Sequence, residues 1–220
     1  MKIGVIFDMD GTLVDSYQAN FESWRRIAEK DGVVITEELF RKTFGQVNRD
    51  VIAASWPGTL DDDKVEEINV NKEIIFRDLL RKNFPPMPGA LDLIKTLHDE
   101  GFKLAIGSSG PKENVALSSE QLGINPYLDG AVSGSDVKHG KPNPEVFLKA
   151  AAKIDVPPEQ CVVVEDVRFG IEAAHAAGMK CIAILSTGHS VEEIQSADKI
   201  IHALSEITPA LIRELVNQNG

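Results

Sequence analysis

The chain has 220 residues, 43% of them hydrophobic, which is enough for one sizeable α/β domain with a smaller insert. No run of 18 apolar residues occurs, and the short apolar stretch before Asp8 is interpreted as a buried strand rather than a signal peptide. A formal net charge of −11 argues against nucleic acid or an anionic membrane surface as a partner. We therefore expect a cytoplasmic location.

Apolar runs suited to buried parallel strands recur along the chain. Four are strong and the last two are weaker: Ile3–Phe7, Lys103–Gly107, Cys161–Val164, Lys180–Leu185, Gly130–Ser133 and Lys199–His202. Helical stretches lie between them, and two have stripes that end at a glycine: Leu91, Ile94, Leu97 and His98 before Gly101, and Ile171, Ala174 and Ala177 before Gly178. This alternation predicts an α/β fold with a doubly wound parallel sheet.

One long region interrupts the alternation of strands and helices. From about Val14 to Pro85 the sequence has helical periodicity and no convincing strand. The spacing of Phe21, Trp24 and Ala28 is an example, since apolar residues three and four apart share one face of a helix. This region is therefore predicted to form helices only.

The stretch Pro85–Gly89 (PPMPG) acts as a stiff hinge after these helices, because proline restricts the backbone and stops helices. We predict a helical cap domain over residues 14–87, inserted into an α/β core of residues 1–13 and 88–220. Ligands of open α/β sheets bind beyond the carboxyl ends of the strands, so the cap is expected to lie over that site.

Two acids stand at the end of the first predicted strand, in the sequence FDMDGT. The strand ends at Asp8, and Gly11 allows the turn that brings Asp10 toward the same cavity. Acids at the edge of a buried strand are unfavourable unless a cation or a reaction requires them. Taken alone, a turn capped by an aspartate side chain explains this motif equally well.

Three further motifs follow later in the chain. IGSSG (residues 106–110) ends the second strong strand with a hydroxyl and a glycine-rich turn into a helix, whose N-terminus suits an anion. GKPNP (140–144) holds Lys141 just before a helix, where a solvated loop lysine is the favoured interpretation if the motif is taken alone. The third strong strand ends with the acidic pair Glu165 and Asp166.

Together these motifs supply Asp8 and Asp10, a serine, a lysine and a second acidic pair. Carboxylate oxygens suit a hard divalent cation such as Mg²⁺, and a serine and a lysine suit a phosphoryl group. A small phosphorylated metabolite is therefore the expected substrate.

The order and spacing of DxDGT, GSS, GKPNP and VED resemble the haloacid dehalogenase superfamily of phosphotransferases over nearly the whole chain. Within it, the chain is most similar to the β-phosphoglucomutase and phosphoglycolate phosphatase-like branch. The helical insert resembles the first cap type of that superfamily.

The resemblance implies a mechanism. Asp8 would attack phosphorus and form an aspartyl phosphate, and Asp10 would protonate the leaving alcohol and then activate water. Ser108 and Lys141 would bind phosphoryl oxygens, and Lys141 would also balance the charge of Asp8.

The same resemblance implies a Mg²⁺ site and a set of substrate contacts. Mg²⁺ would be held by Asp8, the backbone carbonyl of Asp10 and Asp166, while Glu165 is either a fourth ligand or holds a metal-bound water. Further contacts to the substrate are expected from these residues: Thr12, Ser109, Gly110 and, in the cap, Arg49 and Arg77. For the two arginines, a solvated helix position is an equal alternative.

The main rival to a phosphatase is a sugar-phosphate mutase. Asn20 stands where a histidine is common in the mutases, and asparagine cannot shuttle a proton near neutral pH, which favours the hydrolase.

A phosphate-accepting receiver domain is about half this size and lacks a cap, and a metal-free dehalogenase would leave Asp10 and the acidic pair unexplained. The segment from Gly134 to Lys141 departs from a P-loop in its spacing. We expect a monomer or a small homo-oligomer.

Overall fold

The computed structural model describes residues 2–44 and 48–218. The chain forms two compact units. One comprises Met1–Asp15 together with Pro86–Gly220, and is called the core unit below; the other comprises Ser16–Pro85 and is called the helical unit.

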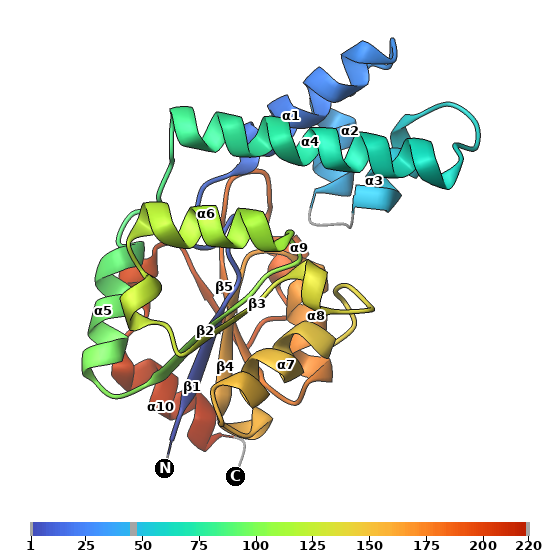
Figure 1. Cartoon of the computed structure of the whole chain (residues 1–220). Coiled ribbons are helices and arrows are strands. Elements are labelled where there is room, and N and C mark those ends of the chain that lie inside the picture. Colours follow the sequence, from blue (N-terminus) through green and yellow to red (C-terminus); the bar gives the residue numbers. More distant parts are fainter. Residues whose placement is uncertain (1, 45–47, 219–220) are drawn as a thin grey trace. The chain divides into compact units, whose positions relative to one another are not determined.

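The core unit contains a six-stranded sheet in the order β3-β2-β1-β4-β5-β6 (Figure 1). Every pairing is parallel. The strands are β1 (Gly4–Phe7), β2 (Lys103–Gly107), β3 (Gly130–Val132), β4 (Cys161–Glu165), β5 (Lys180–Ile184) and β6 (Lys199–Ile201). All six predicted strands are confirmed, with ends that shift by no more than one residue.

Helices connect the strands and cover both faces of the sheet. They are α5 (Ala90–Asp99), α6 (Lys112–Leu122), α7 (Glu145–Lys153), α8 (Arg168–Ala176), α9 (Val191–Ile194) and α10 (Pro209–Asn217). Helices α7 and α8 contact one face, while α5 and α10 contact the other. The predicted doubly wound sheet is therefore confirmed.

The face beneath α7 and α8 forms an apolar core. Alternate residues of the strands, among them Ile6, Ala105 and Val163, point to this face and pack with Phe147. All four are fully buried, and burial of a large apolar side chain stabilises by about 1.5–3 kcal/mol. This packing holds β1 between β2 and β4, so the carboxyl ends of these three strands meet at one edge.

Helix α5 differs from the prediction at two positions. Its buried stripe follows Ala90, Leu93, Ile94 and Leu97, whereas Leu91 is half-buried and His98 is exposed. The reason is helical geometry: both residues lie at the edge of the apolar face, and the face that packs is centred on the other side of Ile94.

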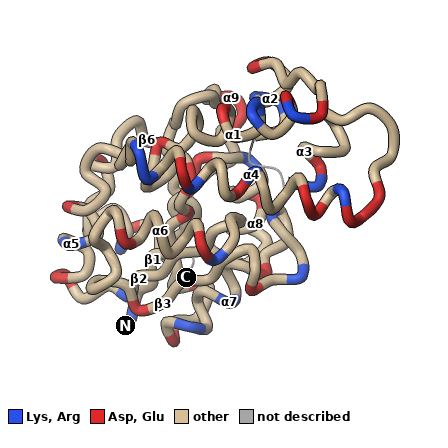
Figure 2. The backbone as a smooth tube through the Cα atoms, turned by 45° about the horizontal axis from the view of Figure 1, so that its top comes forward, with Lys and Arg blue, Asp and Glu red and all other residues tan. Residues whose placement is uncertain are grey.

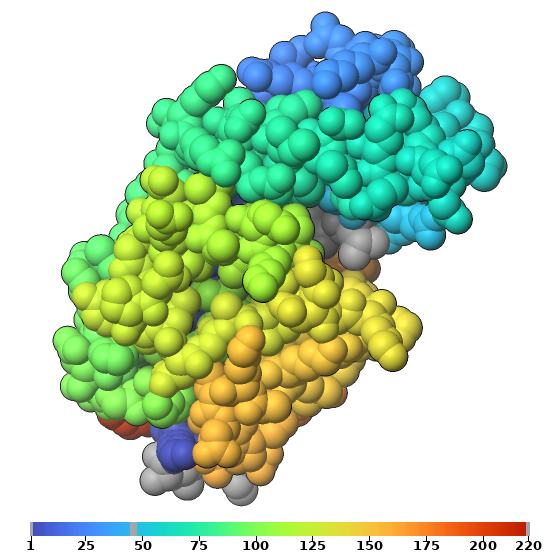
Figure 3. All heavy atoms as spheres, viewed as in Figure 1, coloured from blue at the N-terminus to red at the C-terminus, as the bar shows by residue number. Residues whose placement is uncertain are grey.

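The helical unit contains α1 (Tyr17–Lys30), α2 (Glu37–Thr43), α3 (Asn48–Ser55) and α4 (Asp62–Lys82). Helix α1 packs along α4, which lies along one face of the unit (teal in Figure 3). Acidic and basic residues are interspersed along α4 (Figure 2). The unit has its own core, which includes Trp24, Phe40, Ile52, Trp56 and Ile68.

The prediction of helices only in this part of the chain is confirmed for the residues that the structure describes. Thr36 and Asp61 cap α2 and α4, because each side chain accepts a hydrogen bond from a backbone amide in the first turn. Across the described parts of both units, we find no helix with the length and apolarity needed to cross a membrane.

Candidate active site

The carboxyl ends of β1, β2 and β4 bring polar residues to one edge of the core sheet. Asp8 follows β1, and its amide donates to the carbonyl of Val164 at 2.9 Å. Ser108 follows β2, and its amide donates to the carbonyl of Val132 at 3.0 Å. Because Phe7 pairs with both Ile106 and Val164, these strand ends are level with one another.

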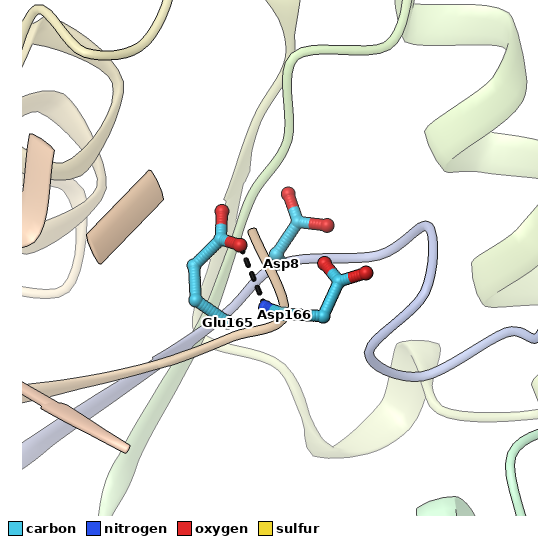
Figure 4. A group of neighbouring side chains, drawn as sticks. All are labelled: Asp8, Glu165 and Asp166. Carbon is cyan, nitrogen blue, oxygen red and sulfur yellow. Dashed lines mark hydrogen bonds between the residues drawn. The ribbon is translucent and has the colours of Figure 1, made fainter. Parts of the chain in front are cut away.

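Three buried carboxyl groups converge at this edge (Figure 4). Asp8, Glu165 and Asp166 each offer an oxygen atom, and these atoms lie within 4.8 Å of one another. We call these three residues the acidic cluster. It forms because parallel neighbours β1 and β4 end at the same edge, although Asp8 and Glu165 are far apart in the sequence.

Lys141 lies between two members of the acidic cluster. Its Nζ atom donates to Asp8 Oδ1 and to Glu165 Oε1, both at 2.5 Å. The Lys141 side chain is only 3% exposed, and its ammonium group is 4.8 Å from the centre of the Phe147 ring. The solvated loop position considered for this lysine is therefore excluded.

Both oxygens of Glu165 have hydrogen-bond donors within the protein. Oε1 accepts from Lys141, and Oε2 accepts from the backbone amides of Asp166 at 2.7 Å and Val167 at 3.0 Å. Gly170, in the first turn of α8, leaves room for this carboxylate: a Cβ atom there would lie 1.9 Å from Glu165 Oε1. Glu165 is thus held in one orientation.

Asp166 is enclosed by Ser186, Thr12 and Gly11, and His189 Nε2 lies 3.9 Å from its Oδ2 atom. Ser186 Oγ donates to Asp166 Oδ2 at 2.8 Å, and Thr12 Oγ1 lies 3.5 Å from Oδ1. Gly11 has a φ of +86°, and a Cβ atom there would lie 1.9 Å from Oδ2. The glycine of the DGT motif is therefore needed both for the turn and for the approach of this carboxylate.

The predicted substrate contacts of the core unit fall into two groups. Thr12 is fully buried and faces Asp166. Near the start of α6, a Cβ atom on Gly110 would lie 3.4 Å from Ser108 Oγ and 3.6 Å from Asp10 Oδ2, so Asp10 and Ser108 lie beside this glycine. Ser109 is exposed next to them.

The two predicted arginine contacts lie in the helical unit. Arg49, on α3, forms an ion pair with Asp62 at the start of α4. Arg77 is half-buried on α4. Gly45–Val47, which precede Arg49 in its motif, lie outside the described residues.

Ser186 and Lys72 are among the buried polar residues that the sequence prediction did not single out. Ser186 lies in the loop after β5 and contacts Asp166, and no motif marked it. Lys72 is buried in the helical unit, where it donates to Asn20 Oδ1 at 3.0 Å and to Glu73 Oε1 at 2.9 Å. A signal for Lys72 did exist, because it stands between Ile68 and Phe76 on the buried face of α4.

The acidic cluster carries more negative charge than the protein itself balances. Burial raises the pKa of Asp8 to about 7, although Lys141 acts to lower it. Burial, with Glu165 and Asp8 nearby, raises the pKa of Asp166 well above its usual value. Burial acts to lower the pKa of Lys141, but the two adjacent carboxylates raise it overall.

These residues fit a divalent cation of the oxygen-preferring type. All three donors are carboxylates, which suit Mg²⁺ or Ca²⁺, and their charge exceeds that of Lys141. A cation at this position would favour the ionised carboxylates and remove the imbalance.

The fold and the site together define the class of the protein. An α/β sheet that gathers buried carboxylates, a lysine and a serine at the carboxyl ends of its strands is suited to hydrolytic chemistry on an anionic group. A family model described as haloacid dehalogenase-like hydrolase matches residues 5–184. The chain belongs to this family.

Named relatives narrow the class. The phosphorylated carbohydrates phosphatase of Thermotoga maritima is 35% identical over 182 residues, which cover 81% of this chain and 82% of that protein. The β-phosphoglucomutase of Bacillus subtilis is 28% identical and covers 96% and 93% of the two chains. A crystal structure of a haloacid dehalogenase-type hydrolase from Entamoeba histolytica superposes with a TM-score of 0.90 at 26% identity, over 99% of this chain and all of that one.

The protein is thus a phosphoric monoester hydrolase of the β-phosphoglucomutase and phosphoglycolate phosphatase-like branch. This confirms the family and the enzyme class that the motifs predicted.

Proposed function

We propose that the protein is a Mg²⁺-dependent phosphatase that hydrolyses a small phosphorylated carbohydrate through an aspartyl phosphate on Asp8. One observation carries this proposal: the buried Asp8 carboxylate accepts a hydrogen bond from Lys141 and lies within the acidic cluster, beside Glu165 and Asp166. The substrate class is supported by the Thermotoga relative, whose name gives phosphorylated carbohydrates as its substrates.

Asp8 is the nucleophile in this proposal. Burial raises its pKa to about 7, so the reactive ionised form depends on nearby positive charge. Lys141 supplies part of that charge through its contact with Oδ1. When bound, Mg²⁺ supplies the remainder and reduces the repulsion between the carboxylate and the phosphate.

The reaction has two steps with balanced bonds and protons. A carboxylate oxygen of Asp8 bonds to phosphorus while the bond to the leaving oxygen breaks, and Asp10 gives its proton to the leaving alcohol. Asp10 then takes a proton from water as the water oxygen attacks the acyl phosphate, which releases phosphate and restores Asp8. Ser108, near Asp10 at the start of α6, binds a phosphoryl oxygen.

The remaining polar residues support these groups. Asp8, Asp166 and the backbone carbonyl of Asp10 would hold Mg²⁺. We assign Glu165 to the orientation of Lys141, because Lys141 and two backbone amides already occupy its oxygens. Thr12 is assigned to the support of Asp166, because its buried hydroxyl lies 3.5 Å from Asp166 Oδ1.

Substrate selection is assigned to the helical unit, with Arg49 and Arg77 as the candidate contacts. Asn20 bears on the choice between phosphatase and mutase. Its side chain donates to Ser16 Oγ at 3.3 Å and accepts from Lys72, and it has no titratable proton. An asparagine therefore cannot control the activation of water by taking up or releasing a proton. This favours hydrolysis of the phosphoenzyme.

The test is a panel of about 50 phosphate esters assayed for released phosphate with Mg²⁺ and with excess chelator. Phosphorylated sugars and polyols should be hydrolysed with Mg²⁺ and not with chelator. A second assay supplies β-glucose 1-phosphate with a catalytic amount of the 1,6-bisphosphate. Isomerisation at ten times the rate of phosphate release would overturn the phosphatase in favour of a mutase, and full activity in chelator would overturn the metal dependence.

A further inference from the structure

The loop after β5 reaches the acidic cluster through one side chain. β4 and β5 are parallel neighbours, and Glu165 at the end of β4 pairs with Ala183. Asp166 and Ser186 therefore leave adjacent strands at the same edge of the sheet. Ser186 Oγ donates to Asp166 Oδ2 at 2.8 Å, and the two side chains are buried.

Several contacts fix this loop in place. The amide of Leu185 donates to the carbonyl of Ile201 at 2.9 Å, and Thr187 Oγ1 donates to Asp15 Oδ2 at 3.2 Å. The amide of Ser190 donates to Glu193 at 2.7 Å, which caps the short helix α9. The hydroxyl of Ser186 is thus presented from a fixed backbone rather than from a free loop end.

The contacts around Asp166 indicate what the Ser186 hydroxyl does. The backbone at Gly11 closes one side of Oδ2, and Ser186 donates to the same oxygen. Thr12 lies near the other oxygen at 3.5 Å, the outer limit of a hydrogen bond. Ser186 therefore makes the shorter of these two hydroxyl contacts and holds the carboxylate in one orientation.

We infer that Ser186 is a positioning residue for the divalent cation, which acts by orienting the carboxylate of Asp166. The inference rests on the proposed function, in which Asp166 is a ligand of Mg²⁺. A ligand that is already oriented loses less conformational freedom when the cation binds, and groups that orient metal ligands typically change metal affinity by about 10–100-fold.

The test measures metal binding in the absence of substrate. Ser186→Ala should weaken the binding of Mn²⁺, measured by electron paramagnetic resonance of the free ion, and of Mg²⁺, measured by calorimetry, by about tenfold. Ser186→Thr keeps the hydroxyl and should restore most of the affinity. Thr187→Ala is the matched control: it removes a hydroxyl from the same loop, one that contacts Asp15 instead of the acidic cluster.

Activity gives a second readout. In Ser186→Ala the Mg²⁺ concentration for half-maximal rate should rise by the same factor, while the rate at saturating Mg²⁺ changes little. Unchanged metal affinity in Ser186→Ala would overturn the inference. If the variant is also less stable than the parent protein in chelator, the hydrogen bond to Asp166 is purely structural. An equal loss in Thr187→Ala would overturn the inference too. A parent protein that binds neither ion would overturn the proposed metal dependence itself, and the role of Ser186 with it.

Discussion

Each of the two units buries a lysine, and the surroundings of the two lysines differ. In the helical unit, Lys72 contacts one carboxylate, Glu73, together with the amide oxygen of Asn20 and the rings of Trp24 and Phe76. In the core unit, Lys141 contacts two carboxylates, and a third, Asp166, belongs to the same acidic cluster.

This difference separates a structural role from a functional one. One ammonium group beside one carboxylate forms a pair, and such a pair can serve packing and specificity of the fold. Three buried carboxylates are more than one ammonium group can neutralise. Burial, together with the neighbouring carboxylates, raises the pKa values of Asp8 and Asp166. An excess of buried charge is therefore a better indicator of a reactive site than a buried lysine by itself.

The largest expected effect comes from the nucleophile. Asp8→Asn should lower turnover by about 10³-fold or more, because an amide is a poor nucleophile and a weaker metal ligand. Circular dichroism would show whether the variant is folded. Retention of more than about a tenth of the parent rate would remove Asp8 from this role.

Asp155→Asn is the matched control for that substitution. Asp155 is exposed and pairs with Lys2, and its φ of +55° is a conformation that asparagine tolerates. This variant should keep the activity of the parent protein.

The two lysines can be compared directly by replacing each with methionine. Lys141→Met and Lys72→Met should each lower the free energy of unfolding by about 3–5 kcal/mol, because each leaves buried carboxylate charge without its partner. In Mg²⁺ the loss for Lys141→Met should shrink, since the cation neutralises the same carboxylates. The loss for Lys72→Met should not change. Urea unfolding followed by circular dichroism, with Mg²⁺ and with chelator, measures both effects.

An exposed lysine provides the baseline. Lys2→Met breaks an exposed ion pair and should stay within experimental error of the parent protein. Equal rescue of both buried-lysine variants by Mg²⁺ would contradict the distinction between the two units.

Metal binding by the parent protein should stabilise the core unit locally. At a Mg²⁺ concentration 100 times the dissociation constant, the stabilisation is about 2.7 kcal/mol. Hydrogen exchange should slow in peptides that contain Asp8 and Asp166 and stay unchanged in peptides from α1. Equal protection throughout both units would contradict a localised site.

Ca²⁺ should inhibit turnover, because it prefers more ligands and longer bonds than the attack requires.

The smallest predicted effect is a pH dependence in the helical unit. Trp56 Nε1 donates to Asp31 Oδ2 at 2.9 Å, and this bond, with help from Lys64, lowers the pKa of Asp31. A lowered folded-state pKa stabilises the unit above the unfolded value of about 3.9, and the stabilisation is lost as pH falls through the folded value.

Asp31→Asn tests this contribution. The variant keeps an oxygen acceptor for Trp56 but has no charge, so its stability should change less than that of the parent as pH falls below about 4. Because Asp31 is exposed, solvent screens its charge and the difference should stay below about 1 kcal/mol. Tryptophan fluorescence reports on the right unit, because both tryptophans of the chain, Trp24 and Trp56, lie there. Identical acid profiles for parent and variant would show that Asp31 contributes no charge effect.

Much of the fold was predictable because its signals are local. The apolar runs that became β1 and β2 are visible without knowledge of any partner strand, and glycines such as Gly101 and Gly178 stop helices through their own backbone freedom. The stripe of α5 was predicted with two errors, Leu91 and His98, because a small rotation of the buried face depends on what the helix packs against.

The candidate site was predictable to the extent that it stands at strand ends. Asp8, Glu165 and Asp166 could be grouped from the rule that parallel strands end at one edge, and the structure brings them together. The sequence signal for the role of Lys141 was weaker, since a lysine just before a helix is common. It contacts Asp8 across 133 residues of chain, and no local pattern encodes such a contact.

The sequence by itself therefore determined the strands, the helical insert, the motif residues and the enzyme family. Each of these follows from short-range periodicity or from a fixed order of residue types. Only the tertiary structure decided which of these residues face one another. It placed Lys141 between two carboxylates, turned Thr12 toward Asp166, and brought Ser186 to the same carboxylate from the next strand. The physical reason is that these contacts depend on which strands become neighbours and on how closely backbone can approach at Gly11 and Gly170, and both are set by the packing of the whole sheet.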